Sequence, residues 1–325
     1  RKRKFFVRIG EQGPVVDRNC RRKPLKYYSL TSMAELKILS GKIVSQDVYN
    51  ALQSRIDTLK SSGCTPGLAA VLVGDDPASN VYVNSKTRRF NKLGLFSESI
   101  RLPENISEDE LLSKIKELNN DERFHGILVQ MPLPRHINES EIIESVDPLK
   151  DVDGFHPENL GRLTAGHPRF VPCTPKGIMR ILEYYKIDPS GKHVVVLGRS
   201  NIVGRPVSIL TSFKKSFSNA TTTICHSGTK DIPYYTQQAD ILIAAIGVSE
   251  FVKADHIKDG VVIIDVGISR IEDDSEKGYK LVGDVDFDSV KDKASAITPV
   301  PGGVGPMTIA MLVENTVEAA KRSIS

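Results

Sequence analysis

The chain has 325 residues, of which 40% are hydrophobic, enough for two domains of ordinary size with buried cores. Its formal charge of +4 is unevenly placed. Residues 1–32 hold ten Lys and Arg against two acidic residues, which leaves 34 basic and 38 acidic residues, or −4, for the rest. This acidic body argues against a nucleic-acid partner, and the lack of a long unbroken apolar run argues against a membrane-spanning protein.

The basic arm, residues 1–32, is poor in apolar periodicity, so we expect it to be disordered. Four interpretations stay open. The arm is an Arg-rich transit segment, an arm for nucleic acid or another partner, an extension without function, or sequence that precedes a native start at Met33. A transit segment would direct the protein to the mitochondrial matrix, and the other interpretations leave the cytoplasm as the expected compartment.

The four cysteines are scattered, and no two of them have the C-x-x-C spacing of a metal or redox motif. The sequence therefore indicates neither a zinc ribbon nor a disulfide framework, and we predict no metal cofactor. A reducing compartment is the expectation for such cysteine usage.

The first half of the ordered sequence alternates helical and strand patterns. A capping box, Ser107 with Glu110, marks the start of the third helix. Helices are predicted at 42–63, 79–93, 107–119 and 138–145, strands at 67–74, 97–102 and 125–130, and a loop at 147–163. This order is typical of a parallel sheet with helical crossovers.

The second half opens with a predicted helix at 173–187 and then repeats short apolar strands. These strands are expected at 193–197, 221–225, 240–246 and 261–266. The fold class is therefore α/β with two domains, a parallel-sheet α/β catalytic domain and a Rossmann-like, doubly wound dinucleotide domain. A last helix, 305–321, could return to the first domain. We place the domains at 33–178 plus 297–325 and at 179–296.

The turn after the strand at 193–197 has the glycine pattern of a nucleotide site. Gly198 and Gly204 lie between that strand and a helix, where backbone can approach a pyrophosphate and free N–H groups point at it. The next strand ends at Ser227 without a carboxylate that would repel a 2′-phosphate, and Arg199 could reach across to that phosphate. The pattern favours NADP over NAD, although Arg199 and Ser227 could also be plain solvated loop residues.

Tyr82 and Lys86, one helical turn apart, follow the carboxyl end of a predicted buried strand, where open α/β sheets bind ligands. Gln130 ends another such strand, and Asp151 and Asp153 lie in a glycine-containing loop. Each has a simpler interpretation. Lys86 could belong to a solvated basic face, Tyr82 could fill the core and Gln130 could cap its strand. The two aspartates could form an Asx turn or a divalent-metal site.

A family resemblance rests on eight motifs in chain order. They are SNVYVNSK, GILVQMPLP, KDVDGFHPENLGRL, PCTPKGI, GRSNIVGRP, DVGI, GDVDF and TPVPGGVGPMT. From about residue 34 to 322 the chain resembles the bifunctional methylenetetrahydrofolate dehydrogenase/methenyltetrahydrofolate cyclohydrolase family. The resemblance implies NADP-dependent oxidation of 5,10-methylenetetrahydrofolate to the methenyl form and hydrolysis of that product to 10-formyltetrahydrofolate. Both reactions would share one cleft, in an enzyme that is usually a homodimer.

The resemblance also implies roles for single residues. The expected catalytic residues are Lys86, Tyr82 and Gln130. The expected folate-binding residues are Asp153, Pro301, Gly302 and Gly303. The expected NADP-binding residues are Gly198, Arg199, Ser200, Ser227 and Ile268.

The expected chemistry separates the two reactions. Hydride transfer needs two rings held face to face and no strong base, because the substrate nitrogens delocalise the cation. Hydrolysis needs protons to move, and a lysine of lowered pKa suits that task. Our hypothesis is that Gln130 and Tyr82 orient Lys86 as the proton shuttle. A dehydrogenase without cyclohydrolase activity is the main alternative, followed by a non-catalytic NADP-binding protein and a nucleic-acid binder that uses the arm.

Overall fold

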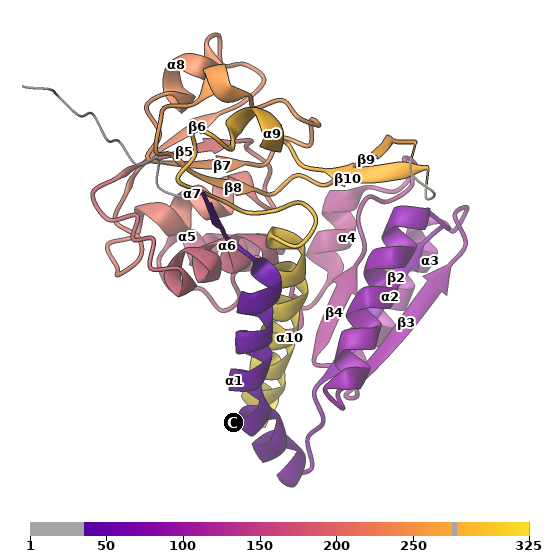
Figure 1. Ribbon diagram of the computed structural model, residues 1–325. Helices are drawn as coiled ribbons and strands as arrows, with labels where there is room; N and C mark the ends of the chain where they lie inside the picture. The colour runs from indigo at the N-terminus through magenta and orange to yellow at the C-terminus, as the bar shows by residue number, and fades with distance from the viewer. Residues whose placement is uncertain (1–35, 275–277, 325) are drawn as a thin grey trace, which may run out of the picture. The chain divides into compact units, whose positions relative to one another are not determined.

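The structure is a computed structural model that describes residues 36–274 and 278–324 (Figure 1). The predictions for residues 1–32 lie outside this part of the chain. None of the helices within it is both long and apolar enough to cross a bilayer.

A three-stranded parallel sheet forms from the first half of the sequence, as predicted. The order is β3-β2-β4, and the central strand β2 is buried along its whole length. Strands β2, β3 and β4 are Gly67–Val73, Phe96–Leu102 and Gly126–Val129. Helices α2, α3 and α4 are Pro77–Lys92, Glu108–Asn120 and Glu139–Ser145.

Side-chain caps explain where two of these helices begin. The carboxylate of Asp76 accepts a hydrogen bond from Ser79 N at 2.7 Å, so α2 starts two residues earlier than its apolar pattern predicts. The capping box predicted from Ser107 and Glu110 is present at the start of α3, with both reciprocal bonds formed.

A six-stranded parallel sheet contains the four strands predicted in the second half, together with β11 and with β1 from the start of the described chain. Its order is β1-β11-β8-β7-β5-β6. The strands are β1 Lys37–Ile38, β5 His193–Leu197, β6 Thr221–Cys225, β7 Ile241–Ala244, β8 Val262–Asp265 and β11 Ala296–Ile297. The edge strand β1 and its neighbour β11 were not predicted, because two residues each are too few to show a period. Helices α7 Gly204–Ser212, α8 Ile232–Thr236 and α9 Phe287–Val290 and the 3₁₀ turn Ala254–His256 complete this region.

The prediction of loop throughout 147–163 is wrong, because helix α5 occupies Pro157–Thr164. Three local features start it. The His156 ring accepts a hydrogen bond from Glu158 N at 3.0 Å, Pro157 occupies the first turn, and Arg162 pairs with Glu158 at 3.1 Å. Histidine is an uncommon cap, so the start signal was not evident from the sequence.

An antiparallel hairpin between β8 and α9 was also not predicted. It pairs β9, Ser269–Glu272, with β10, Tyr279–Val282 (Figure 1). Its side chains are largely polar and only partly buried, so the sequence lacks a clean apolar alternation. The Arg270 guanidinium stacks on the Tyr279 ring at 3.6 Å and ties the two strands together.

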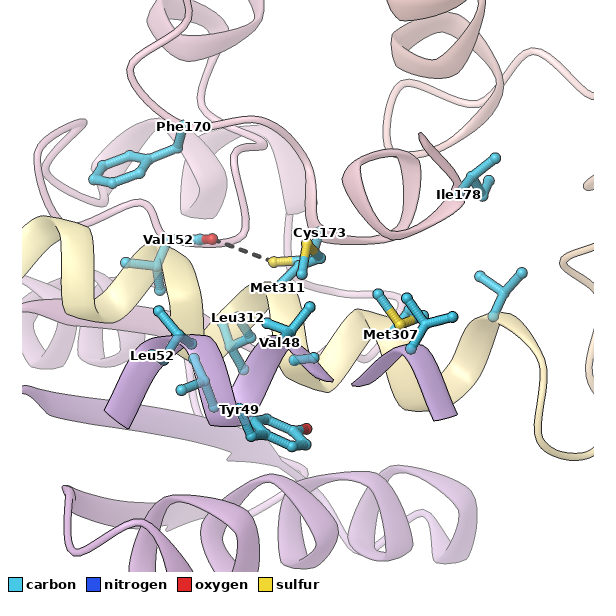
Figure 2. Close-up of a cluster of buried hydrophobic side chains, with 14 of the residues drawn as sticks. Val48, Tyr49, Leu52, Val152, Phe170, Cys173, Ile178, Met307, Met311 and Leu312 are labelled. Carbon is cyan, nitrogen blue, oxygen red and sulfur yellow. Dashed lines mark hydrogen bonds between the residues drawn. The ribbon is translucent and has the colours of Figure 1, made fainter. Parts of the chain in front are cut away.

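Three helices build the largest core cluster. Helix α10, Val304–Ser323, packs against α1, Gly41–Ser61, and α6, Cys173–Tyr184 (Figure 1). Figure 2 shows side chains from all three helices in this cluster, among them Leu52, Met311 and Cys173. Helix α10 also contacts β2 and β4, so the end of the chain lies against the first sheet. This arrangement fits the expected return of the last helix.

Candidate active site

The Lys86 amine lies in a buried position and has a defined partner. Its side chain is 6% exposed, and Nζ donates a hydrogen bond to Gln130 Oε1 at 3.0 Å. The Gln130 amide is oriented in turn, because Nε2 donates to the carbonyl of Met131 at 2.8 Å. Lys86 of α2 and Gln130, the residue that follows β4, therefore lie together at the carboxyl ends of the strands, as the sequence predicted. The interpretation of Lys86 as one residue of a solvated face is wrong.

Lys86 and Asp153 perturb each other electrostatically. Burial lowers the pKa of Lys86, and the charge of Asp153 opposes that shift. Burial also raises the pKa of Asp153 to about 6, while the Lys86 ammonium and a hydrogen bond from Cys173 work against the increase and Asp151 adds to it. The result is an amine and a carboxyl group that both titrate closer to neutrality than usual, an arrangement common at catalytic sites.

Asp151 organises the loop that carries Asp153. Its carboxylate accepts hydrogen bonds from the backbone N–H groups of Gly154, Phe155 and His156 and from the Asn159 amide, at 2.8–3.1 Å. Asp151 therefore forms the loop through its carboxylate, as expected if it belongs to an Asx turn. As a whole residue, Asp153 is half-buried in this loop.

A second set of contacts holds the same loop from α6 and α10. Asn315 Nδ2 donates to the carbonyl oxygens of Val152 and Val171, at 2.8 and 3.1 Å. The Cys173 thiol donates to Val152 O at 3.4 Å, the dashed contact in Figure 2. Burial raises the pKa of this thiol well above its usual value, so it stays a neutral donor. Sequence reasoning missed Asn315, whose only signal is an amide on the mostly apolar buried face of α10.

Tyr82 lies one helical turn from Lys86 on α2 and lines a cavity of about 1080 Å³. Ser85, Ile268 and Pro306 also line this cavity, so α2, the end of β8 and the start of α10 all border it. The hairpin contributes four residues, Ser269, Arg270, Tyr279 and Leu281. The predicted site residues Tyr82 and Ile268 therefore share one cavity.

The predicted folate loop, Pro301 to Gly303, joins β11 to α10 and is tied to the start of α1. Lys42 N donates to Gly302 O at 3.2 Å. Gly302 has a φ of +112°, and a Cβ on Gly303 would lie 2.6 Å from Pro299 O, so neither position accommodates a side chain without strain. The residues that follow, Gly305 and Pro306, line the large cavity, which places the loop beside it.

The glycines of the predicted nucleotide turn are explained by close backbone packing. A Cβ on Gly204 would lie 2.2 Å from Gly198 O, and one on Gly198 would lie 2.1 Å from Ala245 O. Ser200 Oγ accepts hydrogen bonds from Val203 N and Gly204 N and so closes the turn at the start of α7. These features fit a dinucleotide phosphate site, because the turn brings exposed backbone to a helix N-terminus.

Replacing Gly204 with alanine should test this turn. The added Cβ would force the backbone away from Gly198, so the KM for NADP should rise by about tenfold through misplacement of the phosphate-binding groups. Steady-state kinetics with NADP varied would measure it. Gly161→Ala is the matched control, because a Cβ there meets no atom within 4 Å. An unchanged KM for Gly204→Ala would contradict the assignment.

The carboxyl end of β6 lies next to this turn. The Arg199 guanidinium is 3.5 Å from Nε2 of His226, the residue before Ser227. Arg199, Ser200 and Ser227 are all exposed. The structure therefore brings Arg199 and the Ser227 turn together, where both could reach a 2′-phosphate. His226 was missed in the sequence and is fixed here by a bond from Gly228 N to its Nδ1, at 3.0 Å.

Two buried carboxyl groups support the turn that carries Ile268. Asp265 accepts backbone hydrogen bonds from Gly267, Asp284 and Val285 at 2.9–3.1 Å. Asp284 accepts the N–H groups of Ile246 and Gly247 after β7. Burial raises the pKa of Asp265 to about 7. These acids order the carboxyl ends of β7 and β8 and were not identified from the sequence.

Two family domains match the chain. Residues 39–153 match the family domain "Tetrahydrofolate dehydrogenase/cyclohydrolase, catalytic domain". Residues 172–324 match the family domain "Tetrahydrofolate dehydrogenase/cyclohydrolase, NAD(P)-binding domain". Together they cover most of the described residues.

Individual proteins agree with this match. The chain is 54% identical over 291 residues to "Bifunctional protein FolD" of Chlorobium phaeobacteroides, covering 88% of this chain and 99% of that protein. The crystal structure of the FolD methylenetetrahydrofolate dehydrogenase/cyclohydrolase of Campylobacter jejuni is 49% identical with a TM-score of 0.83. A Trypanosoma brucei FolD structure, complexed with NADP cofactor and inhibitor, is 37% identical with a TM-score of 0.84. Both structures cover 89% of this chain, which covers 99% of each.

Proposed function

Because the chain belongs to the tetrahydrofolate dehydrogenase/cyclohydrolase family, we propose that it oxidises 5,10-methylenetetrahydrofolate with NADP and hydrolyses the methenyl product to 10-formyltetrahydrofolate. The observation that carries this proposal is the buried Lys86 amine, bonded to Gln130 and electrostatically coupled to Asp153. A dehydrogenase that performed no hydrolysis would have no evident use for such an amine.

Asp153 is the proposed recognition group for the pterin ring. An aminopyrimidine edge presents adjacent N–H donors, and one carboxylate can accept two of them. The loop contacts of Asp151 and Asn315 hold Asp153 in place, which reduces the freedom lost on binding. The proposed folate loop, Pro301 to Gly303, borders the cavity beside Tyr82 through its link to Lys42.

Gly198, Arg199, Ser200, Ser227 and Ile268 are the proposed NADP-binding residues. The close-packed glycine turn and the exposed Arg199 beside the second strand end fit a phosphorylated dinucleotide. When bound, NADP supplies the hydride acceptor. The residues of the chain then hold the two rings in contact and exclude water from the reacting carbon.

Lys86 is the proposed proton shuttle of the hydrolysis. Water adds to the methenyl carbon and loses a proton, and one ring nitrogen must gain a proton before its C–N bond breaks. Burial lowers the pKa of Lys86, so the amine can accept the first proton and return it to the leaving nitrogen. Gln130 fixes the amine because its Oε1 accepts a hydrogen bond from Lys86 Nζ, with 3.0 Å between the two atoms. Tyr82, which lines the adjacent cavity, is placed to stack beside the substrate.

The test is a spectroscopic assay with 5,10-methylenetetrahydrofolate, run in parallel with NADP and with NAD. We expect faster reduction of NADP and transient methenyl product that disappears faster than in buffer. Methenyl product that decays at the buffer rate would identify a dehydrogenase without cyclohydrolase activity. No reduction of either dinucleotide would reject the proposal.

We further propose a division into a folate domain, 33–178 plus 297–325, and an NADP domain, 179–296. The packing of α10 on α1, α6 and the first sheet supports the discontinuous folate domain. We propose a homodimer without a nucleic-acid partner, and β6, an edge strand of the six-stranded sheet within the described residues, offers a surface for it. Light scattering would give its mass.

We assign the enzyme to the cytoplasm, or to the mitochondrial matrix if residues 1–32 are a transit segment. Its described cysteines, Cys64, Cys173 and Cys225, are free and buried, as expected for a reducing compartment.

A further inference from the structure

Thr298 joins the ends of two neighbouring strands whose following loops carry proposed substrate-binding residues. It follows β11 directly and is 1% exposed. The adjacent strand β8 ends at Asp265, shortly before Ile268. Because β11 and β8 are parallel, the chain leaves both at the same edge of the sheet. A shift between these two strand ends would move the proposed folate loop relative to the turn that carries Ile268.

The Thr298 hydroxyl replaces a backbone group in the pairing of these strands. Thr298 N donates to Ile263 O at 3.1 Å, as in a continued parallel ladder. In such a ladder the carbonyl of Thr298 would accept the N–H of Asp265. Here the hydroxyl oxygen accepts that N–H, at 2.8 Å, and the hydroxyl donates to Asp265 O, with 3.3 Å between the oxygens. The side chain thus keeps the two strand ends bonded while the backbone turns into the loop.

Thr298 packs against both loops. A Cβ on Gly303 would lie 2.8 Å from Thr298 Cβ, so the proposed folate loop folds back directly onto this residue. On the other side, the carboxylate of Asp265 accepts the N–H of Gly267 at 3.0 Å and shapes the turn before Ile268. Thr298 therefore contacts the folate loop through its carbon atoms and holds the Ile268 turn through its hydroxyl.

Both loops reach the large cavity beside Tyr82. Ile268 is 45% exposed and lines this cavity, as do Gly305 and Pro306 after the folate loop. Hydride transfer needs reacting atoms about 3–3.5 Å apart, and a misplacement of about 1 Å can cost on the order of 10²-fold in rate. Oxidation should therefore depend steeply on the relative position of the two loops. Hydrolysis of the methenyl group uses no dinucleotide and should not depend on it.

We propose that Thr298 is a positioning residue for hydride transfer, whose hydroxyl sets the spacing between the Ile268 turn and the folate loop and so between the two reacting rings. The inference rests on the proposed function, which assigns the dinucleotide to the first loop and folate to the second. Thr298 is buried and acts through Asp265 and Gly303, so it is not itself a catalytic residue.

The experiment compares Thr298→Val with Thr298→Ser in separate assays of the two reactions. Valine keeps the shape of threonine, but the N–H of Asp265 loses its acceptor and the strand ends can separate. We expect the kcat of oxidation in Thr298→Val to fall by roughly 10- to 100-fold. The folate loop keeps its second anchor, the bond from Lys42 N to Gly302 O. Hydrolysis of supplied methenyltetrahydrofolate and the KM values for folate and NADP should therefore stay within about twofold.

Two further measurements separate positioning from general damage. Serine keeps the hydroxyl, so Thr298→Ser should retain most of the oxidation rate. With substrate deuterated at its methylene bridge, the isotope effect on kcat in Thr298→Val should be at least as large as in wild type, because hydride transfer is the step that slows. Thr236→Val is the matched control. It removes a fully buried hydroxyl that donates to Ile232 O of its own helix at 3.3 Å, and both reactions should be unchanged.

Thermal melting checks that each variant is folded. Equal losses of oxidation and hydrolysis in Thr298→Val, an unchanged oxidation rate, a smaller isotope effect, or a serine variant no better than valine would overturn the proposal. If the valine variant does not fold, Thr298→Cys carries the test, because a thiol is a weaker acceptor. Its oxidation should fall more than its hydrolysis, and equal losses would again reject the role. A wild-type enzyme that reduces neither dinucleotide would instead reject the proposed function.

Discussion

Replacing Lys86 with methionine is expected to lower cyclohydrolase turnover by roughly 10²- to 10⁴-fold and to leave NADP binding intact. Methionine keeps the unbranched chain that fills the buried position and removes the amine that Gln130 holds at 3.0 Å. Hydrolysis loses its proton shuttle. The proposed NADP site is the separate turn at Gly198, so the dissociation constant of NADP should not move.

The measurement is the rate of methenyltetrahydrofolate disappearance, with fluorescence titration of NADPH as the binding assay. Lys116→Met, a change on the exposed face of α3, is the control for loss of a lysine. Thermal stability should hold in Lys86→Met, because the variant no longer buries an amine that must be desolvated. Cyclohydrolase activity within tenfold of wild type would exclude Lys86 as the shuttle.

The pH dependence of hydrolysis gives a second view of the same amine. Burial lowers the pKa of Lys86, and the shuttle works from the neutral form. Activity should therefore rise with pH up to that lowered pKa and level off above it. The acid limb should vanish in the residual activity of Lys86→Met, whereas a purely structural lysine would leave the profile unchanged.

The contact of Lys86 with Gln130 could be predicted because the two residues follow neighbouring parallel strands, β2 and β4, whose carboxyl ends lie at the same edge of the sheet. Continuous apolar runs mark β2 and β4 as buried, and residues that follow such strands meet at one edge of the sheet. Helices with strong local signals, such as α3 with its capping box, were placed within about a residue. These features depend on interactions within one element or between neighbouring strands.

Other parts of the site could not be predicted, because distant contacts create them. Asn315 holds the Asp153 loop from a helix more than 140 residues away, and nothing local marks it. The hairpin has a polar pattern and reaches the cavity only through the packing of the folded chain. The residues that line the large cavity come from α1, α2, the hairpin and α10, so this cavity is a property of the tertiary structure.

Asp153→Asn should weaken folate binding by on the order of 100-fold and leave the affinity for NADP unchanged. An asparagine keeps the size of the side chain, but it replaces one acceptor oxygen with a donor that faces the pterin N–H groups. It also removes the negative charge that opposes the lowering of the pKa of Lys86, so the acid limb of hydrolysis should move to lower pH. An aspartate that only holds the loop would not weaken folate binding selectively, whereas the shift of the acid limb needs only its charge beside Lys86.

The titration of the Asp153 carboxylate should also be visible in the pH dependence of the wild-type enzyme. Burial raises the pKa of Asp153 to about 6, and the proposed contact with the pterin would need the ionised form. As pH falls below about 6, the KM for folate should rise by about tenfold per unit, while the KM for NADP stays flat. Asp153→Asn should abolish this rise, and Asp109→Asn, on exposed α3, should retain it. Equal losses for both substrates in Asp153→Asn would instead assign Asp153 to holding the fold, because a pterin-specific group cannot affect the nucleotide turn.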